Sequence, residues 1–115
     1  MRSAGKGCLF GIMGGAALFL PLGAVHADSL VYQLTISSHR FEPPTLQVPA
    51  NTKLRLHVQN LDPTAEEFES SDLQREKVIP GKGAIETWIG PLDPGSYKFY
   101  GDFNPASAQG QIIAK

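Results

Sequence analysis

Alternating apolar and polar residues dominate the chain from residue 30 to its end. The alternation is cleanest over residues 53–59, where Leu54, Leu56 and Val58 share one face and the residues between them are polar. A period of two residues over such a run predicts a half-buried β-strand. Residues 30–36 repeat the pattern, so we expect another strand there.

Shorter strands are expected wherever apolar residues recur between turn signals. The segments that fit this description are residues 46–48, 84–89, 97–100 and 110–115. Asn51 can adopt the left-handed conformation in a turn, and Tyr97 follows a proline-glycine turn in the manner of the tyrosine corner of Greek-key sandwiches. No helical period follows residue 27. The pattern therefore predicts an all-β fold, a small antiparallel Greek-key β-sandwich or barrel.

The first 27 residues differ from the rest and are predicted to be a secretory signal peptide. Two basic residues precede an apolar, Gly/Ala-rich run over residues 9–25, and small residues stand before a cleavage position after Ala27. A transmembrane anchor is the alternative, but glycines and a proline interrupt the apolar run. We expect a signal peptide at residues 1–27 and one periplasmic domain at residues 28–115.

Removal of this leader changes the chemistry that remains. Residues 28–115 contain neither cysteine nor methionine, because Cys8, Met1 and Met13 all lie in the leader. Two of the ten basic residues also lie in the leader. Residues 28–115 therefore contain eight Lys and Arg and eleven Asp and Glu, which gives a net charge of −3. This balance offers no basic surface for nucleic acid, and without disulfides the small core alone must stabilise the fold.

The segment from Ala65 to Lys77 concentrates five carboxylates between two predicted strands. They belong to Glu66, Glu67, Glu69, Asp72 and Glu76. In one interpretation they form a solvated loop whose charges are offset by weak surface pairs with Arg75 and Lys77. In the other interpretation they hold a cation.

Four segments in the same order resemble the cupredoxin-like family of exported proteins. They are Phe41-Glu-Pro-Pro with Leu46-Gln-Val-Pro-Ala50, then Leu56-His-Val-Gln-Asn60, then Glu66-Glu-Phe-Glu-Ser70 with Glu76-Lys-Val-Ile-Pro-Gly81, and finally Ile89-Gly-Pro-Leu-Asp-Pro-Gly-Ser-Tyr97 leading to Gly101-Asp-Phe-Asn104. The resemblance is closest to the lone cupredoxin-like domains that accompany bacterial iron-permease systems. It implies a role in iron acquisition, with a membrane iron permease or a periplasmic subunit as partner.

A blue-copper member of this family would place one histidine just after the strand that ends at Asn60. A cysteine, a second histidine and usually a methionine would follow in the loop between the last two strands, where the thiolate creates the trigonal copper site. This chain has Glu66 and Glu67 in the first region, and residues 101–110 contain no cysteine or histidine. Close relatives commonly carry histidine where this chain has Asn104. The comparison implies no type 1 copper.

Oxygen donors in these two regions form the candidate metal site: Glu67, Glu69, Glu76, Asp102 and Asn104. Residues two apart in an extended chain lie on one face, about 6.6 Å from each other, so two glutamates placed in this way can converge on one ion. We expect the first two in a loop and the last two across from them, although Asp and Asn are also common turn formers. Oxygen ligands suit Fe, Mn, Ca or oxidised Cu and do not suit Cu(I), and Cu(II) or an Fe ion is the expected occupant.

The leading hypothesis is an exported metal-binding protein that serves iron acquisition by relaying a metal ion or by assisting Fe(II) oxidation and electron transfer. Any enzymatic role is then an auxiliary ferroxidase role. The alternative is a metal-free β-sandwich that docks on a permease or partner subunit through its acidic end. His39 and His57 are expected to be surface residues, since one lies in a loop and the other on the polar face of its strand.

Overall fold

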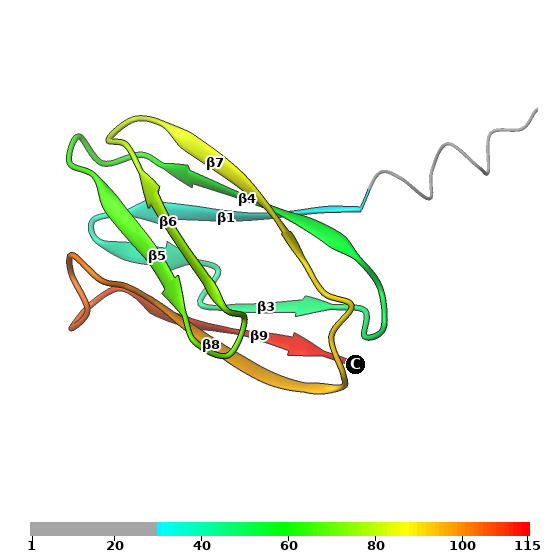
Figure 1. Ribbon diagram of the computed structural model, residues 1–115. Coiled ribbons are helices and arrows are strands. Elements are labelled where there is room, and N and C mark those ends of the chain that lie inside the picture. The colour runs from blue at the N-terminus through cyan, green and yellow to red at the C-terminus, as the bar shows by residue number, and fades with distance from the viewer. Residues whose placement is uncertain (1–29) are drawn as a thin grey trace, which may run out of the picture. The chain divides into compact units, whose positions relative to one another are not determined.

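The computed structural model describes residues 30–115, which fold into nine β-strands in two packed sheets (Figure 1). The strands are β1 (Val31–Ser37), β2 (Arg40–Glu42), β3 (Thr45–Val48), β4 (Leu54–Asn60), β5 (Glu66–Ser70), β6 (Arg75–Ile79), β7 (Ala84–Ile89), β8 (Gly95–Gly101) and β9 (Gln109–Ala114). The apolar alternation correctly predicted β1, β3, β4, β7, β8 and β9. The predicted signal peptide lies outside the described residues. No helix among residues 30–115 is long and apolar enough to cross a membrane.

The two sheets are mixed, which corrects the expectation of a purely antiparallel sandwich. The first sheet has the order β2-β1-β4-β7 and the second β3-β9-β8-β5-β6. β1 pairs with β4 and β3 pairs with β9 in parallel, whereas the other pairs are antiparallel. Pro43 and Pro44 cannot donate to a ladder, so the chain leaves the first sheet after β2 and returns to it only at β4, beside β1. Turn signals do not reveal such crossings.

An aromatic cluster joins the two sheets. Phe41 of β2 packs edge-on against Phe99 of β8 and Phe68 of β5, with ring centroids 4.9 Å and 6.1 Å apart, and the last two rings are 5.1 Å apart. Fully buried aliphatic residues of β1 and β4 complete the core: Leu34, Ile36, Leu54, Leu56 and Val58. The hydrophobic core thus holds β5 and β8 side by side in the second sheet.

The acidic stretch forms a β-hairpin of β5 and β6, so the expectation of a loop is wrong. Glu66, Phe68 and Ser70 alternate on the inner face and are buried, which leaves Glu67 and Glu69 on the outer face. Because only one inward residue is apolar, the hydrophobic pattern gives no strand signal here. In Figure 1 the hairpin is the green pair that lies at the edge of the second sheet.

Asn60, at the end of β4, directs the chain into this hairpin. Its side chain is fully buried, and Nδ2 donates to the carbonyls of Thr64, Ile79 and Pro80 at 2.9, 3.3 and 3.3 Å. Its Oδ1 accepts the N–H of Asp62 at 3.0 Å. These bonds tie the start of β5 to the end of β6, because they satisfy backbone groups from both segments.

Two predicted turn features are confirmed. Asn51 has a φ of 58°, in the left-handed region. The hydroxyl of Tyr97 donates to the carbonyl of Asp93 at 2.8 Å, which is the hydrogen bond expected of a tyrosine corner.

Candidate metal centre

A row of polar side chains crosses four strands on the outer face of the second sheet. Gln109 of β9 lies opposite Tyr100 of β8, Tyr100 lies opposite Glu69 of β5, and Glu69 lies opposite Glu76 of β6. Directly opposed residues have Cβ atoms about 4.5–5.5 Å apart. Glu69 therefore has a phenol on one side and a second carboxylate on the other.

Three glutamates of the hairpin converge on this face. One carboxylate oxygen from each of Glu67, Glu69 and Glu76 lies within 4.8 Å of the other two. Oxygen ligands lie about 2.0–2.6 Å from Ca²⁺ or Mg²⁺, so ligands on opposite sides of an ion are about 4–5 Å apart. Glu67 is only 9% exposed, whereas Glu76 is open to solvent. The three oxygens are spaced as ligands of one cation would be.

The loop after β8 brings Asp102 to the same face. Its backbone N–H donates to the carbonyl of Glu67 at 2.9 Å, and its carboxyl group helps to raise the pKa of Glu67. The two acidic segments therefore lie side by side, as the family resemblance implied. We refer to Glu67, Glu69, Glu76 and Asp102 as the carboxylate cluster.

Crowded negative charge perturbs the groups of this cluster. A hydrogen bond with Glu76, burial and the charge of Glu76 together raise the pKa of Glu67 to about 7, with further contributions from Asp102 and Glu69. Burial, followed by the charges of Glu76 and Asp102, raises the pKa of Glu69. Either a proton or a cation relieves this repulsion.

No Lys or Arg among residues 30–115 forms an ion pair with the carboxylate cluster. The three ion pairs of this region join His39 to Asp62, Arg55 to Glu86 and His57 to Glu86. Arg75, expected to offset the carboxylates, instead donates from Nε and Nη2 to the carbonyl of Trp88 at 3.0 and 2.7 Å. The interpretation of the acidic stretch as a loop neutralised by its own basic residues is therefore wrong.

Asn104 lies near the cluster but contacts Glu66. The Glu66 side chain is 2% exposed, and its Oε2 accepts Nδ2 of Asn104 at 2.8 Å. Its Oε1 accepts the N–H groups of Glu67 and Phe103 at 2.9 and 2.8 Å. The Asn104 amide nitrogen is thus engaged in fixing the last loop to β5.

The donors in this region do not fit a type 1 copper centre. A Cβ added at Gly101 would lie 2.6 Å from Cδ of Glu66 and 2.7 Å from Cβ of Ala108, so the carboxylate and the methyl group fill the space next to Gly101. Residues 30–115 contain no cysteine or methionine. His57 pairs with Glu86 on the first sheet. Only oxygen donors converge here, and they lack the thiolate that a blue-copper site needs.

Sequence reasoning missed Tyr100 as a neighbour of the carboxylates. Tyr97, Phe99 and Gly101 alternate with more exposed residues along β8, which places Tyr100 and Asp102 on the outer face. Side chains alternate between the two faces of a strand, so residues two apart share a face. This places Tyr100 beside Asp102 just as it places Glu67 beside Glu69. The signal was therefore present, but the partner strand was not known.

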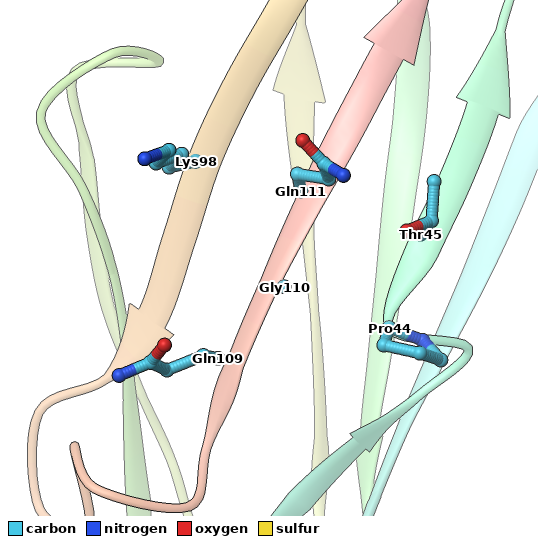
Figure 2. Close-up of a pocket in the computed structure, with 6 residues that line it drawn as sticks. All are labelled: Pro44, Thr45, Lys98, Gln109, Gly110 and Gln111. Atoms are coloured by element: carbon cyan, nitrogen blue, oxygen red, sulfur yellow. The ribbon is translucent and has the colours of Figure 1, made fainter.

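A shallow pocket borders the row at Gln109 (Figure 2). Its lining residues are Pro44, Thr45, Lys98, Gln109, Gly110 and Gln111. Figure 2 shows Gln109 and Gln111 projecting from β9 and Thr45 from β3. This pocket has one cationic group and no carboxylate, so it is not part of the candidate metal centre.

Comparison with known proteins agrees with this fold. A model of the cupredoxin-like domain matches residues 10–114. An uncharacterized protein of Rickettsia prowazekii strain Madrid E is 46% identical over 84 residues, which are 73% of this chain and 67% of that protein.

Solved structures of copper proteins share the architecture at low sequence identity. Auracyanin A, a "blue" copper protein of Chloroflexus aurantiacus, has a TM-score of 0.64 at 10% identity and covers 75% of this chain and 98% of its own. A purple cupredoxin of Nitrosopumilus maritimus has a TM-score of 0.56 at 19% identity, with 72% and 98% covered. On the family match and this shared fold, the chain belongs to the cupredoxin-like domain family.

Proposed function

We propose that this protein binds a metal ion through the carboxylate cluster. The observation that supports the proposal is the approach of three carboxylate oxygens to within 4.8 Å of one another with no basic side chain of the described residues paired to them. Repulsion between such groups is unfavourable unless a proton or a cation neutralises it. At neutral pH a bound cation would neutralise the negative charge of these carboxylates.

The donor set favours a hard or oxidised ion. Carboxylate oxygens suit Cu(II) and Fe ions and do not suit Cu(I). The proposed ligands are Glu67, Glu69, Glu76 and Asp102, while Asn104 holds the last loop in place through Glu66. Because an ion displaces the proton that Glu67 retains near pH 7, the affinity should weaken by about tenfold per pH unit below that value.

The proposed role is iron acquisition in the periplasm, in which the protein relays a metal ion to a membrane permease or a periplasmic partner. The resemblance of the sequence motifs to domains that accompany iron permeases supports this role. Glu76 is exposed on β6, the edge strand of the second sheet, and an exposed ligand can release the ion to another set of ligands. Alternatively, the protein serves iron acquisition by assisting the oxidation of Fe(II) and the transfer of its electron.

Isothermal titration of the purified protein with Cu(II), Fe(II) and Fe(III) tests the proposal. We expect saturable binding to the wild type and its loss in the double variant Glu67→Gln/Asp102→Asn. The matched control is Glu42→Gln/Asp93→Asn, which changes charge equally but lies outside the cluster and should bind as the wild type does. Equal binding by both double variants would remove the site assignment.

A metal-free docking module remains a second candidate, favoured by one observation. Val78, Tyr100 and Phe103, which are 54%, 36% and 51% exposed, lie on strands or loops that carry the carboxylates. Exposed apolar side chains beside charges are typical of protein interfaces. Co-precipitation of a membrane partner that survives chelator but fails in Val78→Ser/Phe103→Ser would favour this candidate over the metal site.

A further inference from the structure

Trp88 of β7 presents a large aromatic ring on the outer face of the first sheet. The residue is 49% exposed, although its neighbours Thr87 and Ile89 face inward and are buried. Trp88 lies opposite Arg55 of β4, and Arg55 lies opposite Val31 of β1, so the three residues form one row across the sheet. This face belongs to the first sheet, whereas the carboxylate cluster belongs to the second.

Two cationic side chains flank the indole ring. Nζ of Lys53 lies 4.7 Å from the ring centroid and Cζ of Arg55 lies 5.5 Å from it, both within the range of cation–π attraction. Glu86 pairs with Arg55 at 3.2 Å, but Lys53 forms no ion pair among residues 30–115. We refer to Lys53, Arg55 and Trp88 as the Trp88 patch. It combines an exposed apolar ring with positive charge that one carboxylate only partly offsets.

The backbone of Trp88 is fixed on both sides. The ladder with β4 holds one edge of β7. At the other edge, Arg75 of β6 donates from Nε and Nη2 to the carbonyl of Trp88 at 3.0 and 2.7 Å. The ring is therefore presented by a rigid strand, and a partner that binds it has little backbone to order.

An indole ring between two cations suits the surface of an anionic membrane. Tryptophan is enriched at membrane–water interfaces, because its ring is apolar and its N–H is polar. Lysine and arginine beside the ring are attracted to anionic lipid headgroups. A stable protein interface, by comparison, buries about 800 Å² on each partner, and three side chains supply only part of that area.

The place at which the described domain begins favours the same partner. Val31 is the first residue of β1 and lies in the row of Arg55 and Trp88. Only residues 26–30 separate it from the apolar run of residues 9–25. Because an extended chain covers at most about 3.6 Å per residue, this connection is about 20 Å long at most. Insertion of the apolar run in a membrane, during export or as a retained anchor, therefore brings the Trp88 patch close to the lipid surface.

We propose that the Trp88 patch docks the domain on an anionic membrane surface. The indole ring then lies at the depth of the headgroups, with Lys53 and Arg55 against the lipid phosphates. Residues 28–115 have a net charge of −3, but four of their eleven carboxylates belong to the cluster on the other sheet. The contact is reversible and weakens as salt screens the charges. It uses a different face from the metal site and does not depend on it.

Fluorescence of Trp88 tests the proposal, because Trp88 is the only tryptophan of the chain and its emission reports on the patch alone. The purified protein is titrated with phosphatidylglycerol vesicles and, separately, with phosphatidylcholine vesicles. We expect phosphatidylglycerol to shift the emission to shorter wavelength and brominated phosphatidylglycerol to quench it, while phosphatidylcholine has little effect.

Matched charge variants identify the residues that carry the contact. Lys53→Gln/Arg55→Gln should weaken the interaction with phosphatidylglycerol by about tenfold or more, since each cation near an anionic surface strengthens binding several-fold. Lys77→Gln/Lys98→Gln, which removes two exposed cations of the second sheet, should respond as the wild type does. An unchanged thermal midpoint in circular dichroism verifies that each variant is folded.

Three results would overturn the proposal. They are an emission that phosphatidylglycerol leaves unchanged, an equal response to both lipids, and an equal response of the two double variants. A shift caused by poly-L-glutamate but not by vesicles would assign the patch to an acidic protein segment instead. Metal titration of Lys53→Gln/Arg55→Gln separates this contact from the proposed function, because the variant should bind Cu(II) as the wild type does.

Discussion

Glu66 and Glu67 are adjacent in β5, but their side chains lie on opposite faces of the sheet and have different environments. Glu66 faces inward, where three N–H donors fix it between β5 and the last loop. Glu67 faces the outer side, where its neighbours are other carboxyl groups. The difference follows from the alternation of side chains along a strand. The same residue type is thus a structural anchor at one position and a candidate ligand at the next.

The pH dependence of stability should report the environment of Glu67. Its pKa rises from the ordinary 4.5 to about 7 on folding, so the folded state holds this proton more tightly than the unfolded state. Its contribution to stability is full below pH 4.5 and is lost as the pH rises through about 7. We expect the thermal midpoint of chelator-treated protein to increase as the pH is lowered from 8 to 5, as measured by circular dichroism.

Replacement of this side chain provides the control. Glu67→Gln should flatten the profile between pH 5 and 8, whereas Glu42→Gln, an exposed glutamate of β2, should leave it unchanged. At lower pH a different group takes over, because backbone hydrogen bonds from His39 and Ser38 lower the pKa of Asp62. Its contribution is lost as the pH falls through that lowered value. A wild-type midpoint that does not change between pH 5 and 8 would contradict the assignment.

At the scale of elements, the site depends on the pairing of the β5–β6 hairpin with β8. β5 contributes Glu67 and Glu69, β6 contributes Glu76, and the strand end of β8 leads to Asp102. Backbone ladders fix Glu67, Glu69 and Glu76 on one face. Asp102 lies in the loop after β8, which the bond from its N–H to the carbonyl of Glu67 holds beside β5. A metal site on strands is more rigid than the loop site that the sequence suggested.

Gly101 controls how closely β8 and its loop approach Glu66. Alanine at this position would place its methyl group 2.6 Å from Cδ of Glu66 and 2.7 Å from Cβ of Ala108. Overpacking of this kind costs about 1–3 kcal/mol. We expect Gly101→Ala to lower the free energy of unfolding in urea by that amount. Ser96→Ala, an exposed change on the same strand, should shift it by less than about 0.5 kcal/mol.

At the scale of the whole molecule, the cupredoxin-like scaffold presents a surface built from oxygen donors. Glu66 and Ala108 pack closely around Gly101, where the last loop begins. The carboxylate cluster lies beside them, on the outer face of the second sheet. The family fold is therefore retained, while the donor atoms gathered on this face are oxygens and do not include the thiolate of a blue-copper protein.

The absorption spectrum of the copper complex should reflect this difference. Cys8 is the only cysteine of the chain, so a Cys8→Ser variant has no thiolate at all. We expect Cu(II) to give this variant only a weak visible band, because intense blue colour requires a Cu–thiolate bond. The unsubstituted chain serves as the comparison. An intense blue band in the variant would contradict the oxygen-donor site.

Much of the fold could be predicted because its signals are local. The alternation in β1, β4 and β7 places apolar residues inside, and the turn residues Asn51 and Tyr97 behave as expected. The proximity of the two acidic segments could also be predicted, but only from the family resemblance. Tyr100 could have been placed on their face from the period of two, had β8 been known to pair with β5.

The sequence by itself determined the all-β class, the absence of sulfur from residues 28–115 and the apolar faces of β1 and β4, because each follows from composition or from a period of two. Only the tertiary structure decided that the acidic stretch is a hairpin, that Glu66 turns inward and that Tyr100 stands opposite Glu69. The physical reason is that a strand of mostly polar residues has no hydrophobic face to reveal its orientation. Its inner face is set by the strands that pair with it, which are distant in the sequence.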